Sequence, residues 1–233
     1  MRKKAVCLIS GGLDSCVTAH IAKNEGYDIY ALSFSYCQRH DKEIESAKKI
    51  ASVVGAKNHI VFDIDLSKFG GSSLTDETLS PDKDHSLDKI GKEIPSTYVP
   101  ARNTIFLSIG LAYAETLDAD AIFIGATATD YSGYPDCRPE YIKAFQEMTT
   151  VATKKGVEGK TIEIKAPLLS MSKAGIIKKG LELKAPFEKT WSCYMGNKKA
   201  CGRCDSCLLR LKGFKEAKFK DPIEYEHLPD WYL

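Results

Sequence analysis

No stretch of the 233-residue chain approaches the ~20 consecutive apolar residues that a membrane-spanning helix needs. Net charge is nearly absent too, because 33 Lys and Arg side chains face 31 Asp and Glu side chains. This balance excludes a protein whose whole surface is an acidic or basic field, although it allows a local basic patch. The chain contains neither internal repeats nor low-complexity tracts. Its 43% of hydrophobic residues is typical of a globular protein, and its length of 233 residues favours one domain with an appendage.

The N-terminus has only part of the pattern of a secretion signal. Basic residues at 2–4 precede an apolar run at 5–9, which is shorter than the ~7–15 residues that the apolar region of such a signal needs. Two glycines follow where a cleavage site would stand. We therefore expect a cytoplasmic protein that has no membrane partner.

Short apolar runs alternate with helical patterns along most of the chain. This alternation indicates βαβ units, and hence an α/β protein with a parallel five-stranded sheet and helices on both faces. The expected strands are 5–10, 29–34, 59–64, 121–125 and 161–165. The expected helices are 14–24, 43–54, 104–116, 141–152 and 173–183, of which 104–116 is apolar nearly all round and is expected to be buried.

Two segments interrupt this alternation. Residues 67–96 are rich in Gly, Ser, Asp and Lys, and a loop of this length is typical of a lid or of disorder. The segment that begins at Trp191 is basic and carries four cysteines. We therefore predict an α/β domain at 1–190, with a lid at 67–96, and a metal-binding segment at 191–233 that packs on the same domain.

The sequence SGGLDS at 10–15 follows the first expected strand and opens the first expected helix. Two glycines let the backbone approach an anion closely, and the N–H groups at the start of a helix point toward it. The spacing matches neither the loop G-x-x-x-x-G-K-[ST] nor the dinucleotide fingerprint G-x-G-x-x-G. The predicted phosphate-binding residues are Ile9, Ser10, Gly11, Gly12, Leu13, Asp14, Ser15 and Cys16.

Four of the eight cysteines gather in one short segment, which in a cytoplasmic chain indicates a metal site rather than a disulfide framework. Cys201, Cys204 and Cys207 have the spacing C-x2-C-x2-C, and Cys193 precedes them. Four thiolates are the ligand set of a closed, structural Zn²⁺ site, and Gly202 lets the loop turn tightly around the ion. An iron–sulfur cluster is the main alternative, although the proline that follows ferredoxin-type runs is missing; free thiols are a third.

SGGLDS resembles the pyrophosphate loop of the N-type ATP pyrophosphatases. Three later motifs narrow this resemblance: YCQRH at 36–40, VPARN at 99–103 and GATATDYSGYPDCR at 125–138. Together they resemble the 7-cyano-7-deazaguanine synthases of the queuosine pathway, over residues 7–214. The resemblance implies a Rossmann-type α/β fold of the adenine nucleotide alpha hydrolase kind, a homodimer, and zinc at the CG-x-CD-x-C pattern.

The resemblance also implies an ATP-dependent ligase. In this family the carboxylate of 7-carboxy-7-deazaguanine is adenylated, ammonia displaces AMP to give an amide, and a second activation followed by elimination leaves a nitrile. Adenylation replaces a poor leaving group by AMP, and the site needs positive charge around the phosphates. We expect Mg²⁺ with the ATP. The absence of a glutaminase domain argues for free ammonium as the nitrogen source.

This chemistry assigns roles to residues of the motifs. Arginine suits forked contacts with phosphate or carboxylate, and an aspartate accepts both adjacent donors of a deazaguanine ring, on which a tyrosine can stack. The expected contacts with the reacting groups are Asp14, Ser15, Arg39, Arg102 and Arg138, with Lys173 as a further phosphate contact or a solvated surface lysine. The expected substrate contacts are Gln38, Arg39, His40, Asp130, Tyr131, Tyr134 and Asp136. Cys37 stands where many family members carry glycine.

Two other functions stay open at this point. The chain could adenylate a tRNA base for thiolation, with the eight basic residues between 198 and 220 as an RNA-binding surface, although a solvated face is their default interpretation. It could also be a zinc-binding adaptor that merely binds ATP. The near-zero net charge argues against RNA as a partner, and an adaptor leaves the motif at 125–138 unexplained. The sequence therefore favours the ligase, with no nucleic-acid partner.

Overall fold

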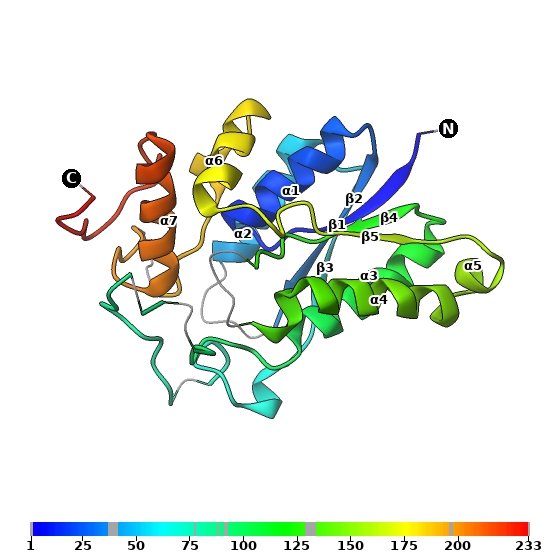
Figure 1. Cartoon of the computed structure of the whole chain (residues 1–233), viewed down its shortest axis with the longest axis horizontal. Coiled ribbons are helices and arrows are strands. Elements are labelled where there is room, and N and C mark those ends of the chain that lie inside the picture. Colours follow the sequence, from blue (N-terminus) through cyan, green and yellow to red (C-terminus); the bar gives the residue numbers. More distant parts are fainter. Residues whose placement is uncertain are drawn as a thin grey trace.

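A sheet of five parallel strands forms the centre of the computed structural model, in the order β3-β2-β1-β4-β5 (Figure 1). The structure describes residues 2–36, 42–76, 78–87, 89–90, 93–128, 134–195 and 198–232. The strands are β1 (Lys4–Leu8), β2 (Asp28–Ser35), β3 (Asn58–Asp63), β4 (Ala121–Phe123) and β5 (Glu163–Lys165). This confirms the predicted α/β class and the parallel five-stranded sheet.

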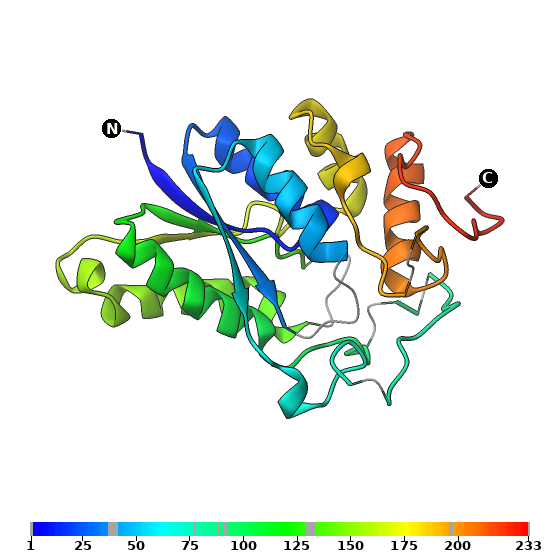
Figure 2. The same ribbon diagram turned by 180° about the vertical axis from the view of Figure 1, so that it is seen from behind.

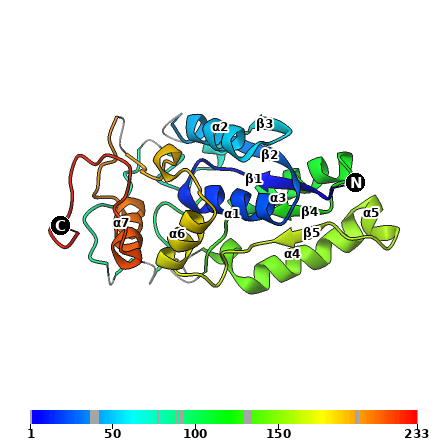
Figure 3. The same cartoon turned by 90° about the horizontal axis from the view of Figure 1, so that it is seen from above.

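Helices cover both faces of the sheet, because successive side chains of a buried strand point to opposite faces and both sets are apolar. On β1, Ala5 and Cys7 belong to one buried cluster, whereas Val6 and Leu8 belong to the other. One face carries α1 (Leu13–Asn24), α2 (Lys42–Val54) and α6 (Lys173–Glu182), and the other carries α3 (Arg102–Thr116) and α4 (Pro139–Ala152) (Figure 3). No helix of the described residues has the length and apolar character to cross a membrane.

Helix α3 differs from its prediction in two ways. It begins at Arg102, two residues earlier than the apolar pattern indicated, so Arg102 and Asn103 lie in its first turn. It is also not buried all round, because Ser108 and Ala112 are exposed while Leu107 is fully buried. A helix that covers one face of an open sheet keeps one side toward solvent, whatever the composition of that side.

Several elements, most of them short, were not predicted from the pattern. They are α5 (Lys154–Val157), the 3₁₀ turns η1 (Ser67–Phe69), η2 (Pro135–Cys137) and η3 (Phe187–Lys189), and the longer helix α7 (Asp205–Ala217). Helix α7 begins directly after the cysteine loop and lies beside α6 at one end of the molecule (Figure 2). The close approach occurs at Gly213, where a Cβ atom would collide with the side chains of Lys173 and Ile177.

A buried ion pair fastens α7 to the segments before and after it. Arg210 Nε and Nη2 donate to the two carboxylate oxygens of Asp221, at 2.6 and 2.9 Å, and the two side chains are only 3% and 1% exposed. Arg210 Nη1 also donates to Thr190 Oγ1 at 2.7 Å. The default interpretation of residues 198–220 as a solvated basic face is therefore wrong for Arg210, because this guanidinium lies in the interior.

We expect Arg210→Met to lower the free energy of unfolding by about 3–5 kcal/mol, since it leaves the Asp221 carboxylate buried without its cation. Urea denaturation followed by circular dichroism measures the loss. Lys212→Met is the matched control on the same helix, because Lys212 is half-exposed and, within the described part of the chain, forms an ion pair with Glu216 alone, at 3.8 Å. A loss of less than about 1 kcal/mol in Arg210→Met would contradict this interpretation of the pair.

Candidate functional site

A cavity of about 300 Å³ lies at the carboxyl end of the sheet. The segments that follow β1, β2 and β4 line it, as do the first turns of α2, α3 and α6. Residues 191–194 and helix α7 close it from the cysteine-bearing end. Ligands of open parallel sheets bind at this edge, so the cavity lies where the sequence predicted the chemistry.

The predicted phosphate loop forms one wall of the cavity. Gly11 has φ +92°, and a Cβ atom at this residue would collide with the backbone carbonyl of Glu43, so the first turn of α2 packs directly on the loop. Ser15 Oγ accepts the backbone N–H of Ser10 at 3.2 Å and donates to the carbonyl of Gly12 at 3.0 Å. No side chain among the described residues caps the N-terminus of α1. Its first N–H groups are therefore available to an anion.

An ion pair across the cavity joins the phosphate loop to α6. Lys173 Nζ donates to both carboxylate oxygens of Asp14, at 2.8 Å each. The Lys173 side chain is only 16% exposed and lines the cavity. The alternative of a solvated surface lysine is therefore wrong, and its ammonium group is fixed beside the N-terminus of α1.

A second cation enters the cavity from the first turn of α3. Arg102 Nη1 donates to the hydroxyl of Tyr36 at 3.3 Å, and the guanidinium lies 5.8 Å from the centre of that ring. Burial acts to lower the pKa of Arg102, but the electrostatic influence of Tyr36, Tyr134 and Tyr194 outweighs it and raises the pKa above its usual value. Among the described residues, no carboxylate lies within ion-pair distance of this guanidinium, so it can hold an anionic ligand.

Aromatic rings form another wall of the cavity. The rings of Phe34 and Phe106 stack at 3.9 Å between centroids, and both line the cavity. Tyr134 also lines it and lies 5.5 Å from Tyr98, and its hydroxyl shares a hydrogen bond of 3.2 Å with Thr97 Oγ1. This wall offers flat apolar surfaces to a planar ring.

The structure brings most of the predicted phosphate-site residues to the cavity. The phosphate-site residues that line it are Ile9, Ser10, Gly12, Leu13, Asp14, Ser15 and Lys173. Arg102, predicted to contact the reacting groups, and Tyr134, predicted to contact the substrate, line it too. Gly11 of the phosphate loop packs on α2. Cys16 does not line the cavity but lies in the core, with its Sγ atom 3.9 Å from His20 Nδ1.

Two other predicted residues lie away from the cavity lining. Asp136 is buried, and its Oδ2 atom accepts the backbone N–H of Asn103 at 2.9 Å, so it caps the start of α3. Arg138 is exposed. The predictions for Gln38, Arg39, His40, Asp130 and Tyr131, and the departure at Cys37, lie outside the described residues. The roles given to all these residues stay predictions.

Several residues of the lining were not predicted from the sequence. Glu43 lies in the first turn of α2, and burial raises its pKa to about 7, against the opposing influence of Arg102. A signal existed, because an acidic residue three positions after the motif at 36–40 lies at a helix start beside the sheet edge. Trp191, Ser192 and Arg210 carry no comparable signal, because their place depends on how the C-terminal segment folds back.

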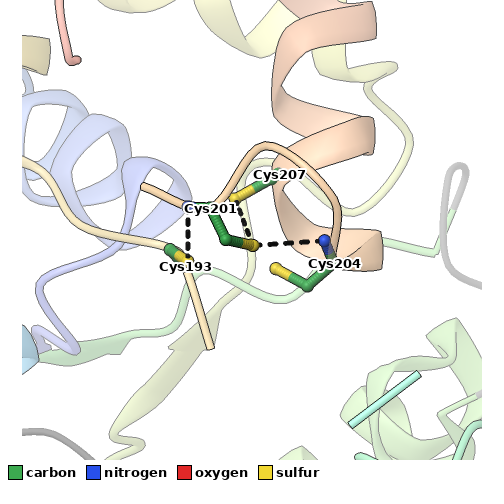
Figure 4. Close-up of side chains that lie close together, drawn as sticks. All are labelled: Cys193, Cys201, Cys204 and Cys207. Atoms are coloured by element: carbon green, nitrogen blue, oxygen red, sulfur yellow. Dashed lines mark hydrogen bonds between the residues drawn. The ribbon is translucent and has the colours of Figure 1, made fainter. Parts of the chain in front are cut away.

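The four clustered cysteines face one another (Figure 4). Their sulfur atoms all lie within 4.8 Å of one another, and the sulfurs of Cys201 and Cys207 are 3.9 Å apart. A disulfide needs about 2.05 Å between its sulfurs, so this is no disulfide. Tetrahedral ligation at ~2.3 Å per Zn–S bond would place the sulfurs ~3.8 Å apart. The cluster therefore fits a single tetrahedral ion.

Backbone N–H groups donate to these sulfurs, as is expected of thiolate ligands. Cys193 Sγ accepts from the N–H groups of Met195 and Cys201, at 3.4 and 3.2 Å, and Cys201 Sγ accepts from those of Arg203 and Cys204, at 3.4 and 3.3 Å. Gly202, at φ +72°, packs on the carbonyl of His227, which a Cβ atom would strike. This agrees with the predicted tight turn.

The thiols of the cluster cannot all be ionised without a cation. Hydrogen bonding with Cys193 lowers the pKa of Cys201, but hydrogen bonding with the same neighbour raises the pKa of Cys207. Four thiolates so close would repel one another, and a bound metal ion removes this repulsion while the thiol protons leave. Cys193 also lines the cavity, so the metal cluster and the cavity share a wall.

We expect Cys204→Ser to lose the bound metal and to lower the melting temperature, because three ligands and a hydroxyl cannot neutralise the cluster equally well. Elemental analysis of the purified protein and a thermal melt measure the two effects. Cys137→Ser is the control, since Cys137 is a buried cysteine outside the cluster and its variant retains the metal. Unchanged metal content and melting temperature in Cys204→Ser would refute a structural ion at this cluster.

Comparison with known proteins identifies the family. The model described as "Queuosine biosynthesis protein QueC" matches residues 4–218. The protein named 7-cyano-7-deazaguanine synthase from Citrifermentans bemidjiense is 56% identical, over 98% of this chain and 100% of its own length. The protein of the same name from Thermoplasma acidophilum is 54% identical, over 99% and 95%. A more distant similarity is to a solved structure of NMN synthetase from Francisella tularensis. Its TM-score is 0.47, with 16% identity over 94% of this chain and 79% of that one. The chain belongs to the QueC family of queuosine biosynthesis proteins.

Proposed function

We propose that this chain is an ATP-dependent ligase that converts 7-carboxy-7-deazaguanine and ammonia into 7-cyano-7-deazaguanine. One observation carries the proposal: a single cavity combines an uncapped helix N-terminus, the Asp14–Lys173 pair and the Arg102 guanidinium with a wall of aromatic rings. Such a cavity suits a nucleotide and a planar, anionic substrate together. The names of the relatives support the same reaction.

In the first half-reaction, a carboxylate oxygen of the substrate attacks the α-phosphorus of ATP. The bond from this phosphorus to the bridging oxygen breaks, and pyrophosphate leaves. The N–H groups at the start of α1 and the Lys173 ammonium group hold the departing phosphates, while Asp14 keeps Lys173 in place. Arg102 binds the anionic groups at the other side of the reacting phosphorus. Mg²⁺ bound with the ATP would neutralise part of the phosphate charge.

In the second half-reaction, ammonia attacks the acyl carbon, and AMP leaves to give the amide. The amide oxygen then attacks the α-phosphorus of a second ATP, and pyrophosphate leaves again. Loss of the remaining amide protons and departure of AMP create the C≡N bond. Both activations use the same phosphate wall, since each converts a poor oxygen leaving group into AMP.

The aromatic wall is our proposed site for the deazaguanine ring. Tyr134 offers its face to the ring beside Phe106. Asp130 and Asp136 remain the proposed acceptors of the two ring donors. Gln38, Arg39, His40, Tyr131 and Arg138 complete the proposed substrate contacts.

We propose that the four cysteines hold one structural Zn²⁺. Four sulfurs within 4.8 Å of one another enclose a single ion and leave no room for the several atoms of an iron–sulfur cluster. The ion would keep residues 191–194 against the cavity, because Cys193 is both a ligand and part of the lining. In this proposal residues 1–190 form the catalytic α/β domain, and the metal-binding segment 191–233 packs on it.

Residues 67–96 are the proposed lid, and they contact the cysteine loop. The backbone N–H of Asp84 donates to the carbonyl of Arg203 at 3.0 Å, and Arg203 Nε donates to Asp84 Oδ1 at 3.0 Å. His85 Nδ1 lies 3.2 Å from Asp205 Oδ2. Because Leu74 of the same segment lines the cavity, a lid fastened to the metal loop would cover bound substrate.

The resemblance supports further proposals about oligomeric state, partners and compartment. It acts as a homodimer, and its partners are the small-molecule substrate and free ammonia. It binds no nucleic acid, in keeping with a net charge of only +2. The compartment we propose is the cytoplasm, where thiols stay reduced and available to a metal.

Mass spectrometry of the protein incubated with ATP, ammonium and 7-carboxy-7-deazaguanine tests the proposed function. We expect the nitrile as the product and AMP as the nucleotide released. Lys173→Met should lower kcat/KM by about 10²- to 10³-fold, the usual cost of removing one charge-stabilising donor. Lys178→Met on the same helix is the matched control, because Lys178 is exposed and outside the lining, and it should retain full activity. AMP release that depends on tRNA, without nitrile, would contradict the proposal.

A further inference from the structure

Trp191 makes one hydrogen bond to the phosphate loop and another to the first cysteine of the metal cluster. Its backbone N–H donates to the carbonyl of Gly11 at 2.9 Å, and its indole Nε1–H donates to the carbonyl of Cys193 at 3.1 Å. Gly11 belongs to the SGGLDS loop, and Cys193 is a proposed metal ligand. A single residue therefore connects the backbones of the two sites.

The bond to Gly11 fixes a part of the phosphate loop that two glycines leave free to turn. Glycine has no Cβ atom, so the peptide group between Gly11 and Gly12 has several accessible orientations. A peptide group is planar and trans, so its C=O and N–H point in opposite directions. By holding the Gly11 carbonyl, Trp191 thus also orients the Gly12 N–H, which donates to Ser10 Oγ at 3.3 Å. Because Gly12 is the N-cap of α1, this orientation affects how the helix start faces the cavity.

The indole ring of Trp191 is held by its surroundings as well. The residue is only 8% exposed and packs in one apolar cluster with the metal-binding cysteines. Lys42 Nζ lies 4.0 Å from the centre of the ring, which is the distance of a cation–π contact. Lys42 is the first residue of α2, and the carbonyl of the next residue, Glu43, packs on Gly11. The ring and the phosphate loop are therefore held to the same helix start.

The segment that carries Trp191 is fixed by the buried Arg210. Its Nη1 atom donates to Thr190 Oγ1 at 2.7 Å and to Ser192 Oγ at 3.5 Å. Both chain neighbours of Trp191 are thus held, so residues 190–192 do not form a free hinge. A displacement of Cys193 is therefore passed on to Trp191 and to the Gly11 carbonyl.

We propose that Trp191 is a positioning residue that couples the order of the cysteine cluster to the ATP-binding conformation of the phosphate loop. This inference rests on the proposed function, because it takes ATP as the ligand of the loop. With metal in the cluster, the Cys193 carbonyl is fixed, Trp191 is held, and the loop keeps the orientation that binds phosphates. Coupling between two binding sites is reciprocal, so bound ATP in turn strengthens the retention of the metal.

The first test is Trp191→Phe in the metal-loaded protein, which removes the indole Nε1–H and keeps an aromatic face for Lys42. Calorimetry without the deazaguanine substrate measures the binding of MgATP in the absence of turnover. The variant should bind MgATP about 2- to 10-fold more weakly, as expected for the net loss of one hydrogen bond. Trp231→Phe is the matched control, because it makes the same exchange at a tryptophan outside the cavity lining, and it should bind MgATP as the native protein does.

The second test is the release of metal to excess 4-(2-pyridylazo)resorcinol, with and without saturating MgATP. In the native protein and in Trp231→Phe, MgATP should slow the release by about fivefold or more, the lower end of the usual coupling between two sites. In Trp191→Phe, MgATP should slow it by less than about twofold, because the connection to the loop is broken. A merely structural role of Trp191 would speed metal release equally with and without MgATP.

The contrary results separate this inference from the proposed function. Native protein that binds MgATP but releases metal equally fast with and without it overturns the inference, whatever the stability of the variant, and leaves the proposed function intact. Protection by MgATP that survives in Trp191→Phe also overturns it, because the coupling then runs through other contacts. Native protein that binds no MgATP refutes both. Protection that depends on Trp191 in a protein that forms no nitrile supports the inference and refutes the proposed product alone.

Discussion

The parallel pairing of β1 with β2 on one side and β4 on the other is the constraint on which the site depends. The chain leaves β1 toward α1 on one face of the sheet, whereas it leaves β4 toward α4 on the opposite face. The segments that follow the two strands therefore diverge, and a crevice opens between them at the carboxyl edge. The phosphate loop, the start of α3 and the segment after β4 all meet in this crevice.

The C-terminal segment closes this crevice, and two features hold it there: a buried ion pair and a cysteine cluster. The Arg210–Asp221 pair holds α7 to the tail of the chain from inside the protein, and the four-cysteine cluster holds the loop before α7. Both features border the cavity, since Arg210 and Cys193 belong to its lining. Helix α7 also buries Leu211 and Phe214, so the charged pair and the proposed metal ion add to hydrophobic packing in ordering this segment.

The charges of the cavity divide the reactants between its walls. Lys173 is held by Asp14 beside the N-terminus of α1, which favours phosphates on that side. Arg102 enters from α3, where Asp136 caps the helix, and Ala101 before it adopts a left-handed conformation, at φ +53°. Such strain, about 1–2 kcal/mol for a residue with a side chain, is typical of backbone that positions a functional group. Glu43 is the exception in sign, because its carboxylate lines the cavity without an ion-pair partner among the described residues.

Patterns within short stretches determined a large part of this protein. Alternating apolar periods predicted the strands and most helices, SGGLDS predicted the loop between β1 and α1, and cysteine spacing predicted the cluster. Tertiary structure alone decided which distant groups meet. Lys173 pairs with Asp14 across 159 positions, Arg210 is buried rather than solvated, and Glu43 faces the cavity. The reason is physical, because periodicity and spacing are local properties, whereas burial and ion pairing depend on which faces of separate elements pack together.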